Sequence, residues 1–171
     1  MGLKVGTVAL EEYNALWVTE FEKEKELLRN ILGDYIQTVE HIGSTAILGL
    51  ISKPIIDIAI GVNTLNMDYI KEMFSDYLDY LVKEDSVDGE VLVVKRFDED
   101  TTTHLIHIME CDKDRYKETI LFRDYMINHP EELSKYVDLK KELAKKYSAD
   151  RKMYTKSKNE FICEILSKAH K

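Results

Sequence analysis

Apolar side chains recur every three or four positions near the start of the chain. Residues 14–32 read NALWVTEFEKEKELLRNIL, and this spacing predicts an amphipathic helix that Asn14 caps and Gly33 ends. The charged run EKEKE then forms the solvated face of that helix. Its inward positions are Leu16, Trp17, Phe21, Leu27, Leu28, Ile31 and Leu32.

A pattern typical of strands follows. Residues 35–41 (YIQTVEH) favour a strand, and residues 55–62 (IIDIAIGV) are nearly all apolar, as in a strand buried on both faces. Between them we expect a Gly-Ser turn and about two turns of helix. Residues 90–97 (EVLVVKRF) and 102–109 (TTHLIHIM) predict two further strands joined by an acidic turn.

The remaining segments have helical spacing. Residues 65–81 predict one helix, with Met67, Ile70, Phe74, Tyr77 and Leu81 directed inward. Three more helices are expected after residue 114: the first begins near there, Pro130 occupies the first position of the second, and the third covers residues 155–171. This order predicts an α+β fold. With few prolines or glycines to mark a boundary, we treat residues 1–171 as one domain, in which an α/β core (1–112) carries packed C-terminal helices (113–171).

Charge divides the chain into two unequal parts. The net charge of −8 disfavours a general nucleic-acid-binding protein. The first 110 residues carry 9 basic and 21 acidic side chains, whereas the last 61 carry 15 and 11. The cationic excess is concentrated in residues 145–158 (KKYSADRKMYTKSK), where two tyrosines are interleaved.

The location expected from the sequence is the cytoplasm. Cys111 and Cys163 lack the spacing of a disulfide framework or a zinc finger. The first residues do not resemble a signal peptide, and no apolar run is long enough to span a membrane. The sequence does not decide the oligomeric state, and a homo-oligomer is compatible with it.

The most informative chemistry lies at Gly43, Ser44 and Asp57. A Gly-Ser turn at the start of a short helix offers N–H groups and a hydroxyl to phosphate oxygens. A carboxylate inside IIDIAI must be hydrogen-bonded, face a cleft or bind a cation, because burial of an unpaired charge is costly. Together they indicate a phosphate site with Mg²⁺, as in nucleotidyltransferases. One carboxylate of the usual pair is absent, because position 59 is Ala59.

The motif HIGSTAILGLISKPIIDIAIGV, at residues 41–62, resembles the signature of the bacterial GrpB family. The resemblance extends over nearly the whole chain, through YNALWVTEFEKEKELL, THLIHIMECD, LFRDYMINHPEELSKYVDLKKELA and RKMYTKSKNEFI. It implies a nucleotidyltransferase-like mixed β-sheet core with flanking helices and a C-terminal helical segment. In some bacteria such a domain is joined to dephospho-CoA kinase. The family implies a fold more firmly than a substrate.

Site residues follow from the resemblance, position by position. Asp57 would take the first metal-carboxylate position, and the backbone around Ser44 would hold phosphate. Lys53 would neutralise phosphate charge, or would instead cap a helix end. Arg123 would reach the phosphates, or would instead pair with Asp124 or another carboxylate. The matched positions are Gly43, Ser44, Lys53, Asp57, His107, Arg123, Arg151, Tyr154 and Lys158.

Two histidines lie on one predicted strand. With Cys111, His104 and His107 have the spacing of a zinc motif, but their odd separation sends them to opposite faces of a strand. The resemblance to the GrpB family implies that His107 is the one at the site, as a base or second metal ligand, although a hydrogen-bonded core histidine fits the pattern nearly as well. Glu110, at the strand end, is a further candidate metal ligand.

Three functions are compatible with these residues. One is transfer of a nucleoside monophosphate from an NTP, with Mg²⁺, to a hydroxyl acceptor. Another is non-catalytic binding of a nucleotide or other phosphorylated metabolite, linked to coenzyme A metabolism, and the third is an interaction scaffold. Residues 145–158 would cover the phosphates in the first two cases, or would instead form a solvated turn between helices.

Overall fold

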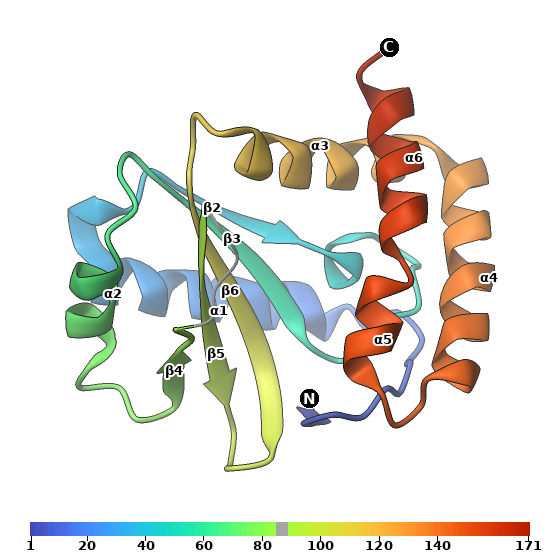
Figure 1. The fold of residues 1–171 in the computed structure, drawn as a ribbon. Coiled ribbons are helices and arrows are strands. Elements are labelled where there is room, and N and C mark those ends of the chain that lie inside the picture. Colours follow the sequence, from blue (N-terminus) through green and yellow to red (C-terminus); the bar gives the residue numbers. More distant parts are fainter. Residues whose placement is uncertain (85–88) are drawn as a thin grey trace.

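A mixed β-sheet forms the centre of the molecule (Figure 1). The computed structural model describes residues 1–84 and 89–171. The strands run in the order β2-β3-β6-β5-β4, and the short β1 also pairs with β6. Only β3 and β6 are parallel among these pairs; the others are antiparallel. The strands are β1 (Leu3–Lys4), β2 (Thr38–Ile42), β3 (Ile56–Val62), β4 (Tyr80–Val82), β5 (Glu90–Arg96) and β6 (Thr101–Glu110).

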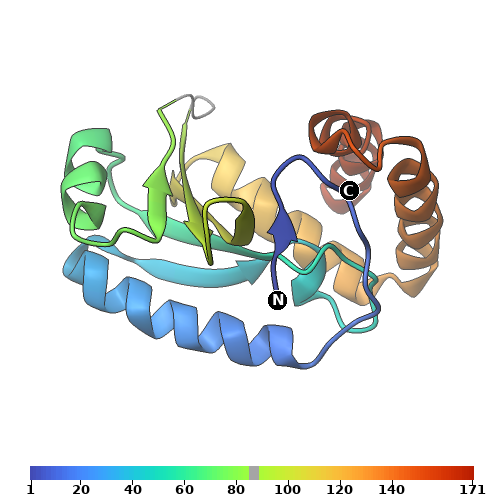
Figure 2. The same ribbon diagram turned by 90° about the horizontal axis from the view of Figure 1, so that it is seen from below.

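Helices cover both faces and one end of this sheet. Figure 2 shows α1 lying along one face, with the last helices of the chain gathered at one end. The helices are α1 (Leu16–Leu32), α2 (Met67–Phe74), α3 (Asp114–Asn128), α4 (Pro130–Lys146), α5 (Arg151–Lys156) and α6 (Asn159–Ala169), with 3₁₀ turns η1 (Gly33–Tyr35) and η2 (Ser44–Ala46). The α+β class expected from the sequence is confirmed. Within the described ranges, no helix has the length and apolar content needed to cross a membrane.

Alternation along the strands separates two apolar layers. Ile58 and Ile106 point towards α1 and α2 and belong to the largest buried cluster. Ala59 and Met109 point to the opposite face and pack with Tyr116 of α3. Because side chains alternate along a strand, Asp57 and His107 share the face of Ala59 and Met109, whereas His104 and Glu110 belong to the other. The first face is the one on which a site can form beneath the C-terminal helices.

The start of the chain fastens α5 to the sheet. The N–H of Val8 donates to the carbonyl of Ser148 at 2.8 Å, and the N–H of Arg151 donates to that of Gly6 at 3.2 Å. Val8 also packs with Leu143 and Tyr154 in a small buried cluster. The N-terminal segment therefore holds the cationic region, residues 145–158, beside the sheet.

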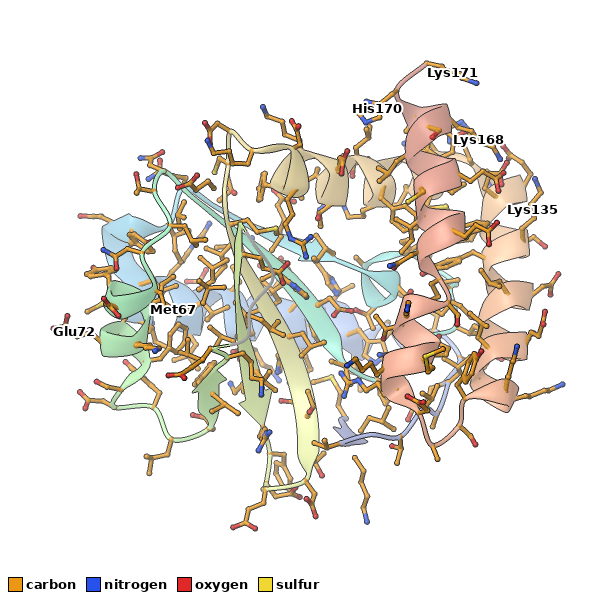
Figure 3. The ribbon with its side chains drawn as sticks, in the orientation of Figure 1. Met67, Glu72, Lys135, Lys168, His170 and Lys171 are labelled. Atoms are coloured by element: carbon orange, nitrogen blue, oxygen red, sulfur yellow. The ribbon has the colours of Figure 1, made fainter. Side chains whose placement is uncertain are left out.

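Helices α4 and α6 are joined by a buried carboxylate. Glu132 of α4, only 6 % exposed, pairs with Lys135 at 3.1 Å and with Lys168 of α6 at 2.9 Å. Figure 3 shows Lys135 and Lys168 on these two neighbouring helices, far from Met67 and Glu72 on α2. The ion pairs hold the C-terminal end of α6 beside α4.

Three predicted helices differ from the structure. The helix expected over residues 65–81 ends at Phe74, because Tyr80 is buried as part of strand β4 and its hydroxyl donates to Glu24 at 2.6 Å. The helix expected over residues 155–171 is divided into α5 and α6. The helix expected after Ser44 is only the single turn η2, which Gly49, at φ +79°, follows.

Candidate functional site

Strands β3 and β6 bring Asp57 and His107 together. Parallel pairing places Ala59 opposite His107 and Asp57 opposite Leu105. The Nε2 atom of His107 lies 3.7 Å from Oδ1 of Asp57, and the two side chains are 23 % and 28 % exposed. The predicted carboxylate and the predicted histidine therefore face each other at an opening in the surface.

The Gly-Ser turn passes directly over Asp57. Gly43 has φ +66° and ψ −167°, a conformation that is almost restricted to glycine. A Cβ atom at this position would lie 2.5 Å from Oδ2 of Asp57. Gly43 is thus required both for its backbone conformation and for the close approach of the turn to the carboxylate.

Replacing Gly43 with alanine is expected to lower the free energy of unfolding by about 3 kcal/mol, from backbone strain and from the clash with Asp57. Thermal unfolding should show a loss of roughly 6–12 °C. Gly49→Ala is the matched control, since Gly49 also has positive φ but has no heavy atom within 4 Å of the added Cβ. Equal losses in the two variants would contradict a role for the contact with Asp57.

Two adjoining hollows open beside Asp57. The smaller, which we call the polar pocket, has a volume of about 180 Å³; the larger, which we call the α3–α6 groove, has a volume of about 580 Å³. Both are lined by Ser44, Asp57, His107 and Lys158. The polar pocket is also lined by Lys53, Lys140, Arg151, Tyr154 and Thr155.

Cations from both halves of the chain converge on the polar pocket. The Nζ atoms of Lys53 and Lys158 lie 5.5 Å and 4.8 Å from the ring centroid of Tyr154, which is fully buried. An aromatic ring between two ammonium groups stabilises both through cation–π attraction. The hydroxyl of Tyr154 is buried and has no hydrogen-bond partner in the part of the chain that the structure describes.

Burial and mutual repulsion alter the ionisation of these groups. Burial, together with the charges of Arg151 and Lys158, lowers the pKa of Lys53 to about 7. Burial also lowers the pKa of Arg151. Burial would raise the pKa of Asp57, but the His107 imidazole and the Lys53 ammonium outweigh it and hold that pKa below its usual value. An anion in the pocket would relieve this excess of positive charge.

Comparison with known proteins identifies the family. The sequence model described as GrpB protein matches residues 7–168. This chain belongs to the GrpB family. It is 38 % identical to the glutamate-rich protein GrpB of Alkalihalophilus pseudofirmus, with 98 % of each chain covered. It is 33 % identical to the UPF0157 protein YqkA of Bacillus subtilis, covering 88 % of this chain but only 43 % of YqkA.

A solved GrpB structure has the same fold. The crystal structure of conserved protein GrpB from Enterococcus faecalis superposes with a TM-score of 0.83 at 30 % identity, covering 94 % of this chain and 96 % of that one. The mixed sheet with its C-terminal helices is therefore the fold of the GrpB family, consistent with the nucleotidyltransferase-like core that the motifs imply.

Most of the GrpB motif positions named from the sequence meet at the two hollows. Arg123 does not line either one. Its guanidinium contacts Asp124 at 2.8 Å and Glu40 at 2.7 Å, and donates to the carbonyl of His41 at 3.0 Å. Arg123 thus holds α3 against β2 and makes the carboxylate contacts that were its alternative role.

The structure also separates the other proposed metal ligands from Asp57. Glu110 accepts a hydrogen bond from the N–H of Leu65 at 2.9 Å, on the far face of the sheet. His104 is buried and lies 3.0 Å from Thr103 Oγ1, so its odd separation from His107 excludes a shared zinc ion. The expectation that Glu110 shares a metal with Asp57 is therefore wrong, because strand alternation directs the two carboxylates to opposite faces.

Sequence reasoning missed Glu90, the partner of His107 in this GrpB protein. Its carboxylate lies 2.6 Å from Nδ1 of His107 and 2.6 Å from Nε of Arg115, and its side chain is 5 % exposed. Burial by itself would raise the pKa of Glu90. The two cations outweigh burial and lower this pKa to about 2. Burial by itself would lower the pKa of His107. The carboxylates of Asp57 and Glu90 outweigh burial and raise this pKa to about 9. His107 is therefore charged at neutral pH.

Lys140 was also missed. It is 2 % exposed, its ammonium donates to the carbonyl of Ile51, and its Nζ lies 5.4 Å from the Tyr136 ring centroid. Burial lowers its pKa well below the usual value. In sequence, this lysine lies in a charged helical run that gives no sign of burial; only the packing of α4 against residue 51 reveals it.

Proposed function

We propose that this chain binds a phosphorylated small molecule through its phosphate groups in the polar pocket. One observation carries the proposal: in residues 1–84 and 89–171, no carboxylate lies within 4.0 Å of the charged groups of Lys53, Arg151 or Lys158. Three cations near one another, with Asp57 as the negative charge that acts on Lys53 and Arg151 among the described residues, make a site that an anion stabilises.

The remaining lining residues suit phosphate oxygens. Charge-assisted hydrogen bonds to lysine and arginine are stronger than neutral ones, and the hydroxyls of Ser44 and Thr155 add neutral donors. The charge of His107, held by Glu90, adds to the positive potential at the shared opening. The C-terminal cations and the Gly-Ser turn would then hold the same phosphate groups from opposite sides.

The side chains do not fit a resident Mg²⁺. Magnesium prefers oxygen ligands in octahedral geometry. In the part of the chain that the structure describes, no group of three or more His, Cys, Asp or Glu side chains could hold a metal ion. The charged His107 occupies the place beside Asp57 where a second ligand would stand. The protein's own cations supply the charge that a metal would otherwise bring.

Asp57→Asn is the direct test. In metal-free buffer the variant is expected to bind pyrophosphate about 3- to 10-fold more tightly than the wild type, because one negative charge beside the ligand is removed. Isothermal titration calorimetry with and without Mg²⁺ would measure this change. Weaker metal-free binding by Asp57→Asn, or no pyrophosphate binding by the wild type, would contradict the proposal.

Nucleotidyl transfer is the second candidate. It is favoured by the position of Asp57 and His107, which line both hollows at the point where they meet. In that case Asp57 would bind Mg²⁺ brought by an NTP, and affinity would depend on Mg²⁺ and fall in Asp57→Asn. Release of pyrophosphate from NTPs in the presence of hydroxyl acceptors would identify this activity; dephospho-coenzyme A belongs among the ligands tested because of the family resemblance.

A further inference from the structure

The α3–α6 groove has a different character from the polar pocket. One wall comes from α3, with Glu118, Thr119 and Phe122, and the other from α6, with Ile162 and Leu166. Phe122 lies four positions after Glu118 and three after Thr119, and Leu166 lies four positions after Ile162, so each set lies along one side of its helix. The groove therefore runs between α3 and α6, which contact each other.

The groove begins at the proposed phosphate site. Lys158, which lines both hollows, immediately precedes α6, and Leu166 lies eight residues further on. At about 1.5 Å per residue this is roughly 12 Å along the helix. A molecule with its phosphates beside Lys158 would extend its remaining part along this groove.

The lining favours a flat ring with polar edges. Phe122 presents an aromatic side chain, and its ring lies 6.0 Å from that of the buried Tyr136, which fixes the ring in place. Glu118 is exposed on the same helix face, and no ion pair to it is formed by residues 1–84 or 89–171. An alkyl chain would use the apolar wall but would leave Glu118 without a partner. The amino and hydroxyl groups of a nucleoside would use both.

We propose that the α3–α6 groove binds the nucleoside part of a nucleotide, with its base against Phe122 and its sugar or base edge beside Glu118. This inference rests on the proposed function, because the phosphates are placed in the polar pocket. The volume of about 580 Å³ lies in the range usual for small-molecule sites, whereas the polar pocket, at about 180 Å³, accommodates little more than phosphate groups.

Comparing ATP with tripolyphosphate separates the two hollows. The wild type is expected to bind ATP at least 10-fold more tightly than tripolyphosphate, measured by calorimetry with CTP, GTP and UTP in parallel. Phe122→Ala should weaken ATP binding about 10-fold, the size of a lost base–aromatic contact, and change tripolyphosphate binding less than 2-fold. Phe97→Ala, at an aromatic side chain that is 82 % exposed outside both hollows, should change neither.

A second variant guards against loss of folding. Leu166→Trp adds volume to the far end of the groove without removing a buried side chain, and should weaken ATP binding but leave tripolyphosphate binding unchanged. Equal affinity of the wild type for ATP and tripolyphosphate would overturn the groove assignment and leave the phosphate site standing. So would tighter binding of an alkyl phosphate than of any nucleotide. Failure of every polyphosphate to bind would instead overturn the proposed function.

Discussion

Replacing Lys53 and Lys158 together with methionine is expected to weaken pyrophosphate binding by at least 100-fold. Each lysine would contribute a charge-assisted hydrogen bond in a largely desolvated pocket, and each such bond is worth about 1.5–3 kcal/mol. Methionine preserves much of the apolar contact with the Tyr154 ring, so the folded structure should persist. Calorimetric titration, with thermal unfolding as the check on folding, measures the effect.

The control is Lys152→Met/Lys156→Met. It removes the same number of positive charges, both from helix α5, but neither lysine lines the polar pocket or the α3–α6 groove. Its affinity for pyrophosphate should fall less than about 3-fold, as expected for screened surface charges. Similar losses in both double variants would mean that only the general positive field of this region attracts the anion.

The pKa of Lys53, about 7, adds a pH signature to this prediction. A bound phosphate favours the charged amine, so binding takes up a proton and affinity falls as pH rises above about 7. Lys53→Met should bind weakly at every pH and lack this part of the dependence. Calorimetry in buffers of different ionisation enthalpy would measure the proton uptake.

Glu90→Gln is expected to lower the free energy of unfolding by about 3 kcal/mol or more, the largest effect on stability that we predict. The substitution removes the buried carboxylate that His107 and Arg115 share, so that Asp57, at 3.7 Å, is the carboxylate that remains beside His107. The pKa of His107 should fall with it, which NMR titration of the imidazole would detect. Glu99→Gln, at an exposed carboxylate, is the control and should change stability by less than about 0.5 kcal/mol.

The ion pair between Glu90 and His107 also predicts how the free energy of unfolding depends on pH. The pKa of His107 is raised by folding from 6.5 to about 9, so its contribution is complete below pH 6.5 and is lost as pH rises through 9. The shift corresponds to about 3 kcal/mol. Lys53 has the opposite effect: because folding lowers its pKa to about 7, its contribution makes the free energy of unfolding rise as pH increases above 7. The difference between wild type and His107→Gln isolates His107, and a difference that is constant from pH 6 to 9.5 would contradict the shift.

Local patterns predicted the parts of the fold that depend on neighbouring residues. The alternation around Asp57 and His107 indicated which face each side chain takes, and the structure has both on the face of Ala59. Helix α1 was predictable because its apolar period continues for four turns and Gly33 ends it. The sequence resemblance added Lys53, for which capping of a helix end was the alternative, and Tyr154 and Lys158, which composition alone would have left in a solvated turn.

The unpredicted parts depend on contacts between distant segments. Glu90 stands at the start of a strand, where a charged residue is ordinary, and only the antiparallel pairing of β5 with β6 brings it to His107. The same holds for Tyr80, whose burial against Glu24 ends a helical pattern early. Neither the register of a sheet nor the packing of one helix on another is encoded within a window of neighbouring residues.

The docking of the first residues against α5 has a consequence for ligand binding. Gly6 and Val8 hold Arg151 and Ser148 in place by backbone hydrogen bonds, against the mutual repulsion of the cations that this docking gathers. A ligand that neutralises those cations would strengthen the attachment of residues 145–158 to the rest of the protein. Ligand binding in the polar pocket and docking of residues 145–158 are therefore thermodynamically linked, and each should strengthen the other.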